Sequence, residues 1–309
     1  LAYLLGVALL YAAHGVLDLA ELAARLRPSP AVFAAVALLT AGLAMKTALV
    51  PLHGWLPPAH SSAPAPASAL LSALVVKASF YVLLRLSLGA LAAVRTPEVD
   101  AVLGGLGVAA ILWGSWNALR QVRLKLVVAY STVGQLGYLF LVFPLSRGAG
   151  GSAAFAGAAY FALSHACAKA ALFLAAGNVQ KSLGHDRLAD MRGAASALPV
   201  TFFAVALAAL SLAGLPPSGG FVAKWLLLKG ALVEGEWVLA GVLVAGGLLA
   251  VAYLGRVLAR AVEWPGGGAP SHARLPLGLE LPVLGLALVA VLLGLLAPWP
   301  LSLLRVGGP

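Results

Sequence analysis

Charged side chains are scarce in this sequence. Asp, Glu, Lys and Arg make up 10% of the 309 residues, whereas a soluble domain carries roughly 25%. The hydrophobic fraction is 62% and the mean hydropathy is +1.00. Apolar runs of about 20 residues, long enough to cross a hydrocarbon core of roughly 30 Å as helices, recur along the chain. These features exclude a soluble globular domain and indicate a multi-pass protein of the lipid bilayer.

Cysteine is nearly absent, and so are the motifs of cofactor sites. The single Cys167 excludes an internal disulfide framework and any multi-cysteine metal site. The pair Gly104-Gly105 lacks the surrounding pattern of a phosphate-binding loop. We therefore expect no metal, no other cofactor and no catalytic residues in this chain.

An initiator methionine is also missing, and the sequence begins inside an apolar run. The run from Leu1 to Ala13 ends at His14-Gly15, which is shorter than the roughly 20 residues that a spanning helix requires. No basic segment precedes it, as one would in a signal peptide. We expect an N-terminally truncated chain that starts partway through a helix.

Hydropathy predicts an all-α, polytopic transmembrane bundle of about nine helices. Besides the first run, the predicted helices cover residues 31–57, 64–88, 99–119, 123–144, 152–178, 197–232, 237–260 and 277–298. Two of them contain helix breaks, at Pro51 and at Pro216-Pro217. Unwound backbone persists at membrane depth only where protein or a water-filled cavity satisfies its polar groups. Two such breaks indicate an ion pathway.

The basic residues between the predicted helices indicate an orientation. The net charge is +10, which in a soluble protein would favour nucleic acid or other acidic partners. Here, five Lys and Arg residues follow the odd-numbered predicted helices and nine follow the even-numbered ones. The positive-inside rule places the second group in the cytoplasm. We expect the protein in the inner (plasma) membrane of a cell, with no nucleic acid partner.

Four lysines remain near mid-membrane after connections and helix ends are removed: Lys46, Lys77, Lys169 and Lys224, with His165 one turn before the third. Each costs about 2.5–3.5 kcal/mol to insert. A lysine near a helix end can extend to the membrane surface or pair structurally, but Lys77 lies halfway along its predicted helix. Desolvation brings the pKa of a lysine toward neutrality, so a buried lysine can take up and release protons. A polar axis for protons is therefore predicted.

Acidic residues are missing from this axis. Glu280 stands at the start of the last predicted helix, and the remaining Asp and Glu residues lie in connections or near helix ends. We expect an acidic partner on an adjacent subunit or in the missing N-terminal part.

Four segments, in this order, resemble the antiporter-like, proton-conducting subunits of complex I, the related multi-subunit cation/proton antiporters and the membrane hydrogenases. The segments are Lys46-Thr-Ala-Leu-Val-Pro-Leu-His-Gly-Trp-Leu-Pro-Pro-Ala-His60 continuing to Lys77, Ala129-Tyr-Ser-Thr-Val-Gly-Gln-Leu-Gly-Tyr138, Leu163-Ser-His-Ala-Cys-Ala-Lys-Ala-Ala-Leu-Phe-Leu174, and Ser211-Leu-Ala-Gly-Leu-Pro-Pro-Ser-Gly-Gly-Phe-Val-Ala-Lys-Trp225. Together they cover about residues 40–230.

The resemblance implies inverted five-helix repeats, each with one broken helix, around a hydrated axis. Residues 1–92 would be the C-terminal part of an incomplete first repeat, 93–262 the second repeat, and 263–309 an extra C-terminal helix. Lys46 would load protons, and Lys77, His165 and Lys169 would pass them on. Lys224 would stand on the exit side.

Each of the other polar residues near the axis has two possible roles. His53 and His60 flank the first break and either line the cytoplasmic access to it or hydrogen-bond its freed carbonyls. Ser131, Thr132 and Gln135 either bring water into their helix or join it to its neighbours. The sequence departs from the family at Pro58, where an acidic residue is common, and lacks the glutamate that pairs with the first lysine.

The expected function is proton translocation as a subunit of a NADH:quinone oxidoreductase or a related redox complex such as a membrane hydrogenase. The alternative is a subunit of a multi-subunit Na⁺/H⁺ antiporter, in which Na⁺ is also carried. A solute carrier would need a substrate-sized pocket, and a non-conducting scaffold would have a vestigial axis. All but the solute carrier imply other membrane subunits as partners.

We predict that Lys77→Arg abolishes proton translocation as completely as Lys77→Met. Arginine keeps its charge under nearly all conditions and cannot release a proton. Pumping into vesicles that contain the full-length protein measures this. Activity that survives in the arginine variant but not in the methionine variant would make Lys77 an electrostatic element instead of a carrier.

Overall fold

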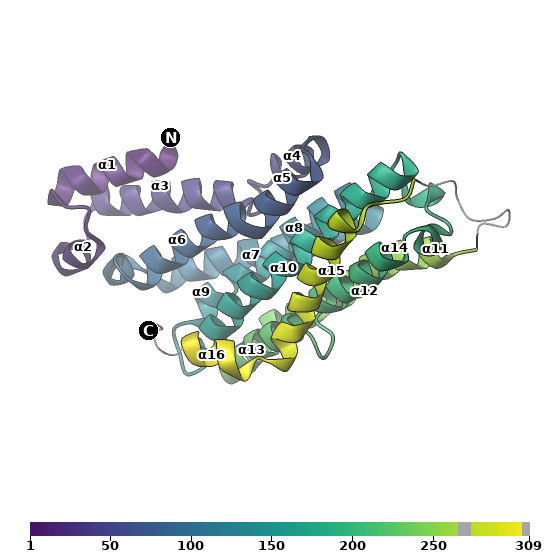
Figure 1. Ribbon diagram of the computed structural model, residues 1–309. Helices are drawn as coiled ribbons and strands as arrows, with labels where there is room; N and C mark the ends of the chain where they lie inside the picture. The colour runs from purple at the N-terminus through teal and green to yellow at the C-terminus, as the bar shows by residue number, and fades with distance from the viewer. Residues whose placement is uncertain (265–272, 305–309) are drawn as a thin grey trace.

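The computed structural model describes residues 1–264 and 273–304, and this part of the chain is helical (Figure 1). Seven of its helices are long and apolar enough to cross a membrane, or eight if the bent pair formed by the first two is one span. The helices are α1 (Ala2–His14), α2 (Leu19–Arg25), α3 (Pro30–Thr47), α4 (Leu56–Ser62), α5 (Ala65–Leu70), α6 (Val76–Leu88), α7 (Pro97–Arg120), α8 (Leu124–Phe140), α9 (Val142–Leu145), α10 (Gly151–Leu183), α11 (Ala194–Ala197), α12 (Pro199–Ala213), α13 (Gly219–Val233), α14 (Trp237–Val262), α15 (Leu277–Leu295) and α16 (Pro298–Leu304).

The predicted all-α membrane bundle is confirmed, and most predicted helices match to within a few residues. The exception is the predicted helix 31–57, whose end is wrong. Helix α3 stops at Thr47 because Ala48 adopts a left-handed conformation with φ of 60°. A turn follows, and α4 begins as a separate helix at Leu56. The predicted helix 197–232 is divided into α12 and α13, which have 15 residues each and are too short to span alone.

Helix α8 is the buried centre of the bundle. In the apolar 18-residue stretch that marks residues 124–145 as a candidate span, 89% of the residues are buried. This is the largest share among the candidate spans. Helix α7 approaches it closely, since a Cβ on Gly114 would lie 2.3 Å from the backbone nitrogen of Gly134. Small residues allow helix backbones to pack at such short range in membranes. Polar side chains on α8 therefore point into protein and not into lipid.

The connections assigned to the cytoplasm gather at one end of the bundle. The backbone nitrogen of Leu124 donates to the carbonyl of Asp186 at 2.7 Å, and the Asp186 carboxylate pairs with Arg123 at 2.9 Å. Arg192 pairs with Glu263 at 3.2 Å. These contacts join the α7–α8, α10–α11 and α14–α15 connections, so the three connections lie on the same side of the membrane.

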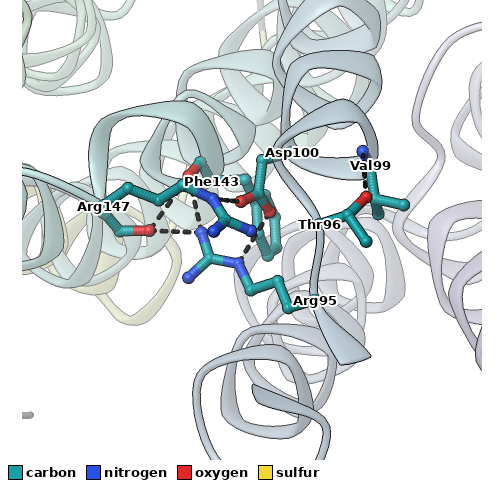
Figure 2. Close-up of polar contacts among 7 residues, drawn as sticks. Arg95, Thr96, Val99, Asp100, Phe143 and Arg147 are labelled. Atoms are coloured by element: carbon teal, nitrogen blue, oxygen red, sulfur yellow. Dashed lines mark hydrogen bonds and ion pairs between the residues drawn. The ribbon is translucent and has the colours of Figure 1, made fainter. Parts of the chain in front are cut away.

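A second ion cluster lies among the connections predicted on the opposite side (Figure 2). The Asp100 carboxylate is 1% exposed, pairs with Arg95 at 2.8 Å and also binds Arg147. Arg95 donates further hydrogen bonds to the Phe143 carbonyl at 2.7 Å and to Ser146 Oγ at 2.6 Å. The cluster thereby ties the start of α7 to the end of α9.

We expect Asp100→Asn to lower the free energy of unfolding by about 3 kcal/mol. The amide keeps the shape of the side chain but leaves two arginines without a counter-charge, and breaking buried ion pairs costs roughly 3–5 kcal/mol. The lower end applies because 37% of the Arg147 side chain remains exposed. Thermal unfolding of the purified protein in detergent measures the change. Asp190→Asn at an exposed position is the control, expected within about 0.5 kcal/mol of wild type.

Candidate functional site

Three of the four predicted lysines are buried inside the bundle. Lys77 on α6 is 7% exposed, Lys169 on α10 is 0% and Lys224 on α13 is 9%. Along the part of the chain that the structure describes, none of the three forms an ion pair with a carboxylate. Their amines instead bind carbonyl and hydroxyl oxygens. We refer to these three residues as the lysine axis.

Lys77 begins the axis beside a widened turn. A π-helical turn, Leu71–Val75, separates α5 from α6 directly before it. The Lys77 amine folds back and donates to the carbonyl of Ser72 within this turn. Single π turns inside helices occur frequently at functional sites. Here the turn provides a backbone acceptor for a cation that would otherwise be unpaired.

Hydroxyl and carbonyl groups lie between Lys77 and Lys169 along α8. Ser72 Oγ lies 3.1 Å from Thr132 Oγ1, and Thr132 Oγ1 lies 3.0 Å from the Val128 carbonyl. The Lys169 amine donates to the same carbonyl at 3.1 Å and also binds Ser131 Oγ. These groups form a polar track between the two amines. Ser72 offers its carbonyl to Lys77 and its hydroxyl to Thr132, and the Val128 carbonyl is an acceptor shared by Thr132 and Lys169.

The Val128 carbonyl faces more donors than it can accept. Lys169, Ser131 and Thr132 all reach it, at 3.1, 2.9 and 3.0 Å. A carbonyl oxygen has two lone pairs, so the three hydrogen bonds cannot all be strong at once. Because hydroxyl groups rotate freely, Thr132 can turn its proton toward Ser72. The arrangement allows hydrogen bonds to be exchanged without moving a helix.

Lys224 is held by the break between α12 and α13. Its amine donates to the carbonyls of Leu212 at 2.7 Å and Ala213 at 3.3 Å. These carbonyls belong to the last turn of α12, which has no partners within its own helix and carries the negative end of the helix dipole. The amine also lies 4.5 Å from the ring centre of Tyr138. The break around Pro216 and Pro217 thus supplies the acceptors for a buried cation.

Gln135 links the two ends of this region. Its Nε2 donates to the Leu212 carbonyl at 3.3 Å, the acceptor that Lys224 also uses, and to the hydroxyl of Tyr253 at 3.1 Å. The three α8 residues predicted as accessory, Ser131, Thr132 and Gln135, all lie along the axis and are at most 1% exposed.

His165 lies in the same region but makes no hydrogen bond to the described residues. It is 2% exposed, and neither ring nitrogen has a partner. Its ring stacks on Phe161 with centroids 5.4 Å apart, and Phe161 stacks on Tyr138 at 5.3 Å. A buried imidazole without partners is costly, so its nitrogens are available to water or to a moving proton.

Lys46 and His53 lie apart from the axis. Lys46 is exposed near the end of α3 and lines a groove of about 730 Å³ beside α1 and α6. His53 lies in the turn after α3 and accepts a hydrogen bond at 3.2 Å from Trp113 Nε1 on α7. Burial lowers the pKa of His53, so its ring is neutral at pH 7. The first break at Pro51 therefore faces the surface of this chain, unlike the second.

His60 is fully buried between the first break and the axis. It stacks on Phe173 with centroids 4.3 Å apart, and neither ring nitrogen has a partner in the described chain. Burial and the charges of Lys169, Lys125 and Lys77 lower the pKa of His60 to about 3. Residues 61–65, next to it in sequence, line a polar pocket of about 410 Å³ together with Lys125.

Sequence reasoning missed three residues that contact this region: Lys125, Tyr138 and Tyr253. Lys125, at the start of the predicted helix 123–144, is 5% exposed and its amine binds the Ala63 carbonyl. Tyr138 and Tyr253 are 1% and 0% exposed. A tyrosine far from the ends of an apolar helix is the signal that could have identified Tyr253, because membrane tyrosines ordinarily collect at the interfaces.

We predict that Gly214→Ala disrupts the site around Lys224. Gly214 has φ of +82°, and a Cβ there would lie 2.6 Å from Lys224 Cδ. The left-handed conformation alone costs roughly 1–2 kcal/mol for alanine, and the lysine must also shift. Thermal stability and proton translocation should both fall. Gly241→Ala is the control, because nothing lies within 4 Å of its Cβ position. An unchanged translocation rate in Gly214→Ala would show that the amine position is unimportant.

Comparison with known proteins agrees with this architecture. The chain is 42% identical over 310 aligned residues to NADH-quinone oxidoreductase subunit N of Desulforudis audaxviator, covering 95% of this chain and 61% of that protein. It is 29% identical to F(420)H(2) dehydrogenase subunit N of Methanosarcina mazei, covering 96% and 61%. The chain thus spans about three-fifths of the length of these relatives.

Solved structures with the same fold come from different complexes. The chain matches the Mrp complex of Dietzia sp. with a TM-score of 0.88 and 28% identity, covering 98% of this chain and 64% of that one. It matches respiratory complex I of Thermus thermophilus with a TM-score of 0.83 and 25% identity, covering 100% and 67%. The model of the family described as NADH:quinone oxidoreductase/Mrp antiporter, TM, matches residues 1–250. The chain belongs to this family of membrane proteins.

Proposed function

We propose that this chain conducts protons across the cell inner (plasma) membrane as part of an antiporter-like subunit of a NADH:quinone oxidoreductase or related redox complex. The observation that carries the proposal is the row of buried lysines inside an otherwise apolar bundle, with the polar groups of Ser72, Thr132 and Val128 lying between Lys77 and Lys169. Family membership and the relatives named subunit N support it.

The physical basis is a set of amines with oxygen acceptors but no counter-ions. A lysine paired with a carboxylate would hold its proton, whereas carbonyl and hydroxyl oxygens bind the amine without fixing its charge. Each lysine can then lose its proton when a neighbouring lysine is charged, because two like charges in a medium of low dielectric constant repel each other. Protons would move along the axis in single steps between adjacent lysines.

The remaining assignments belong to the same proposal. Residues 1–92 and 93–262 would be parts of two inverted repeats, followed by an extra helix. Lys46, exposed beside α1, would take its acidic partner from elsewhere in the full protein or complex, whose other membrane subunits are the expected partners. The end that carries Arg123 and Arg192 would face the cytoplasm.

A Na⁺/H⁺ antiporter subunit is the second candidate. The observation in its favour is the match to the Mrp complex, with a TM-score of 0.88. In that case the same lysine axis would move protons against Na⁺ without a redox reaction.

The proposal predicts that Lys169→Met and Lys224→Met each lower proton translocation about tenfold or more. Methionine fills a similar volume but cannot carry a proton, and a proton-transfer group contributes roughly 10²–10⁴-fold to a rate. The measurement is acidification of inverted membrane vesicles that contain the full-length protein in its complex, driven by NADH. Lys229→Met is the matched control, because Lys229 lies on the same helix as Lys224 but is exposed.

Wild-type acidification by both axis variants, with normal assembly, would contradict the proposal. The two candidate functions are separated in the same vesicles. Acidification driven by NADH without Na⁺ supports the redox complex. Proton movement that requires a Na⁺ gradient and no electron donor supports the antiporter.

A further inference from the structure

Tyr253 has an unusual position for a tyrosine in a membrane helix. It stands nine residues before the end of α14 at Val262, and it is 0% exposed. Nine residues correspond to roughly 14 Å along a helix, which places the ring well below the interface where tyrosines ordinarily collect. Its hydroxyl points toward α8, where it meets Gln135 at 3.1 Å. This depth and direction require an explanation.

The hydrogen bonds around Gln135 fix the direction of the Tyr253 proton. One atom of the Gln135 amide lies 3.3 Å from the Leu212 carbonyl and 3.1 Å from the Tyr253 hydroxyl. A carbonyl oxygen only accepts hydrogen bonds, so this atom must be the nitrogen. One of its two N–H groups donates to the Leu212 carbonyl, and the other donates to the Tyr253 hydroxyl oxygen. The phenol proton is therefore left for another acceptor. Ser131 stands four residues before Gln135 on the same face of α8 and is the other side chain next to the Tyr253 hydroxyl. When its hydroxyl turns away from the Val128 carbonyl, it can donate to the phenol oxygen.

These contacts attach Tyr253 to both halves of the lysine axis. Ser131 Oγ binds the Lys169 amine on one side. On the other side, Gln135 shares the Leu212 carbonyl with the Lys224 amine, at 3.3 and 2.7 Å. The Tyr253 hydroxyl stands between Ser131 and Gln135, so its oxygen can accept from Ser131 while its own proton is donated to a third acceptor.

The other side of the gap between Lys169 and Lys224 is aromatic. The rings of Tyr138, Phe161 and His165 stack at centroid distances of 5.3 and 5.4 Å. The Tyr138 hydroxyl is turned away toward the Leu243 carbonyl at 3.4 Å, so it cannot serve the axis. Of the two buried tyrosines here, only Tyr253 turns its hydroxyl toward the axis, while His165 in the stack offers ring nitrogens.

We propose that the Tyr253 hydroxyl transfers protons between the Lys169 half and the Lys224 half of the axis. This inference rests on the proposed function of the chain. Protonated Lys169 gives a proton to Ser131 Oγ, whose own proton passes to the phenol oxygen. As that O–H bond forms, the original phenol O–H breaks and its proton moves to a water molecule.

The water completes the transfer to the neutral amine of Lys224. Gln135 Oε1 is a buried acceptor without a partner in the described chain, and such an atom is ordinarily satisfied by a buried water. Lys169 loses one proton, Lys224 gains one, and Ser131, Tyr253 and the water are neutral before and after. The step therefore needs no oxidant or reductant.

The first test compares two tyrosines that are equally buried. Tyr253→Phe removes the proposed transfer group and should lower NADH-driven acidification of inverted vesicles about tenfold or more. Tyr160→Phe removes a hydroxyl that binds the Leu293 carbonyl outside the axis, and it should acidify like wild type. Assembly of the complex is checked for both. Wild-type acidification by Tyr253→Phe would overturn the proposal.

A second test separates proton transfer from a structural hydrogen bond, and it applies even if Tyr253→Phe fails to assemble. Fluorinated tyrosines at position 253 keep the ring and hydroxyl but make the O–H progressively more acidic. A transferring group should show a translocation rate that changes several-fold along the series, as a Brønsted relation requires. The same series at position 160 should be flat, and a flat series at 253 would refute the transfer role.

Lys169→Met in the same vesicles distinguishes a failure of the proposed function of the chain from a failure of the role of Tyr253 alone. If it pumps like wild type, the proposed function fails. If it stops pumping while Tyr253→Phe pumps normally, the function stands and only the role of Tyr253 is overturned.

Discussion

Three amines inside an apolar bundle, with no carboxylate bound to them in the described chain, are the constraint on which the rest of this structure depends. Each buried lysine must find oxygen acceptors at membrane depth, where ordinary helices offer none. Lys77 finds one at a π turn, Lys224 finds two at the free end of α12, and Lys169 finds a carbonyl and a hydroxyl on α8. The irregular backbone of the bundle therefore lies beside the buried lysines, where its carbonyl groups accept hydrogen bonds from their amines.

Helix α8 allows these separate sites to work as one. It is buried on all sides, and Ser131, Thr132 and Gln135 project from it toward the lysine axis. Its close contact with α7 uses glycine and not large side chains, so its position is fixed by backbone packing. The ion clusters at the two ends of the bundle, around Asp100 and Asp186, hold the neighbouring connections. A rigid central helix with rotatable hydroxyls is suited to moving protons without moving helices.

Much of the site was predictable because membrane insertion penalises charge so strongly. Hydropathy predicted the helices. A lysine in the middle of an apolar run, such as Lys77, could be recognised as unusual because inserting its charge into the membrane costs free energy. The family motifs added the order of the residues and the two breaks. The end of the helix predicted over 31–57 was wrong because the left-handed turn at Ala48 is a local backbone choice that hydropathy does not register. The functional roles of these residues stay predictions.

The sequence by itself determined the class of protein, the number of helices to within one or two, and three of the buried lysines. Composition and periodicity suffice for these because the bilayer acts on each segment separately. Only the tertiary structure decided which acceptors hold each amine, that Lys46 lies apart from the axis, and that the Tyr253 hydroxyl meets Gln135 of α8. Those facts depend on contacts between residues up to 118 positions apart, and no local pattern in a single sequence encodes them.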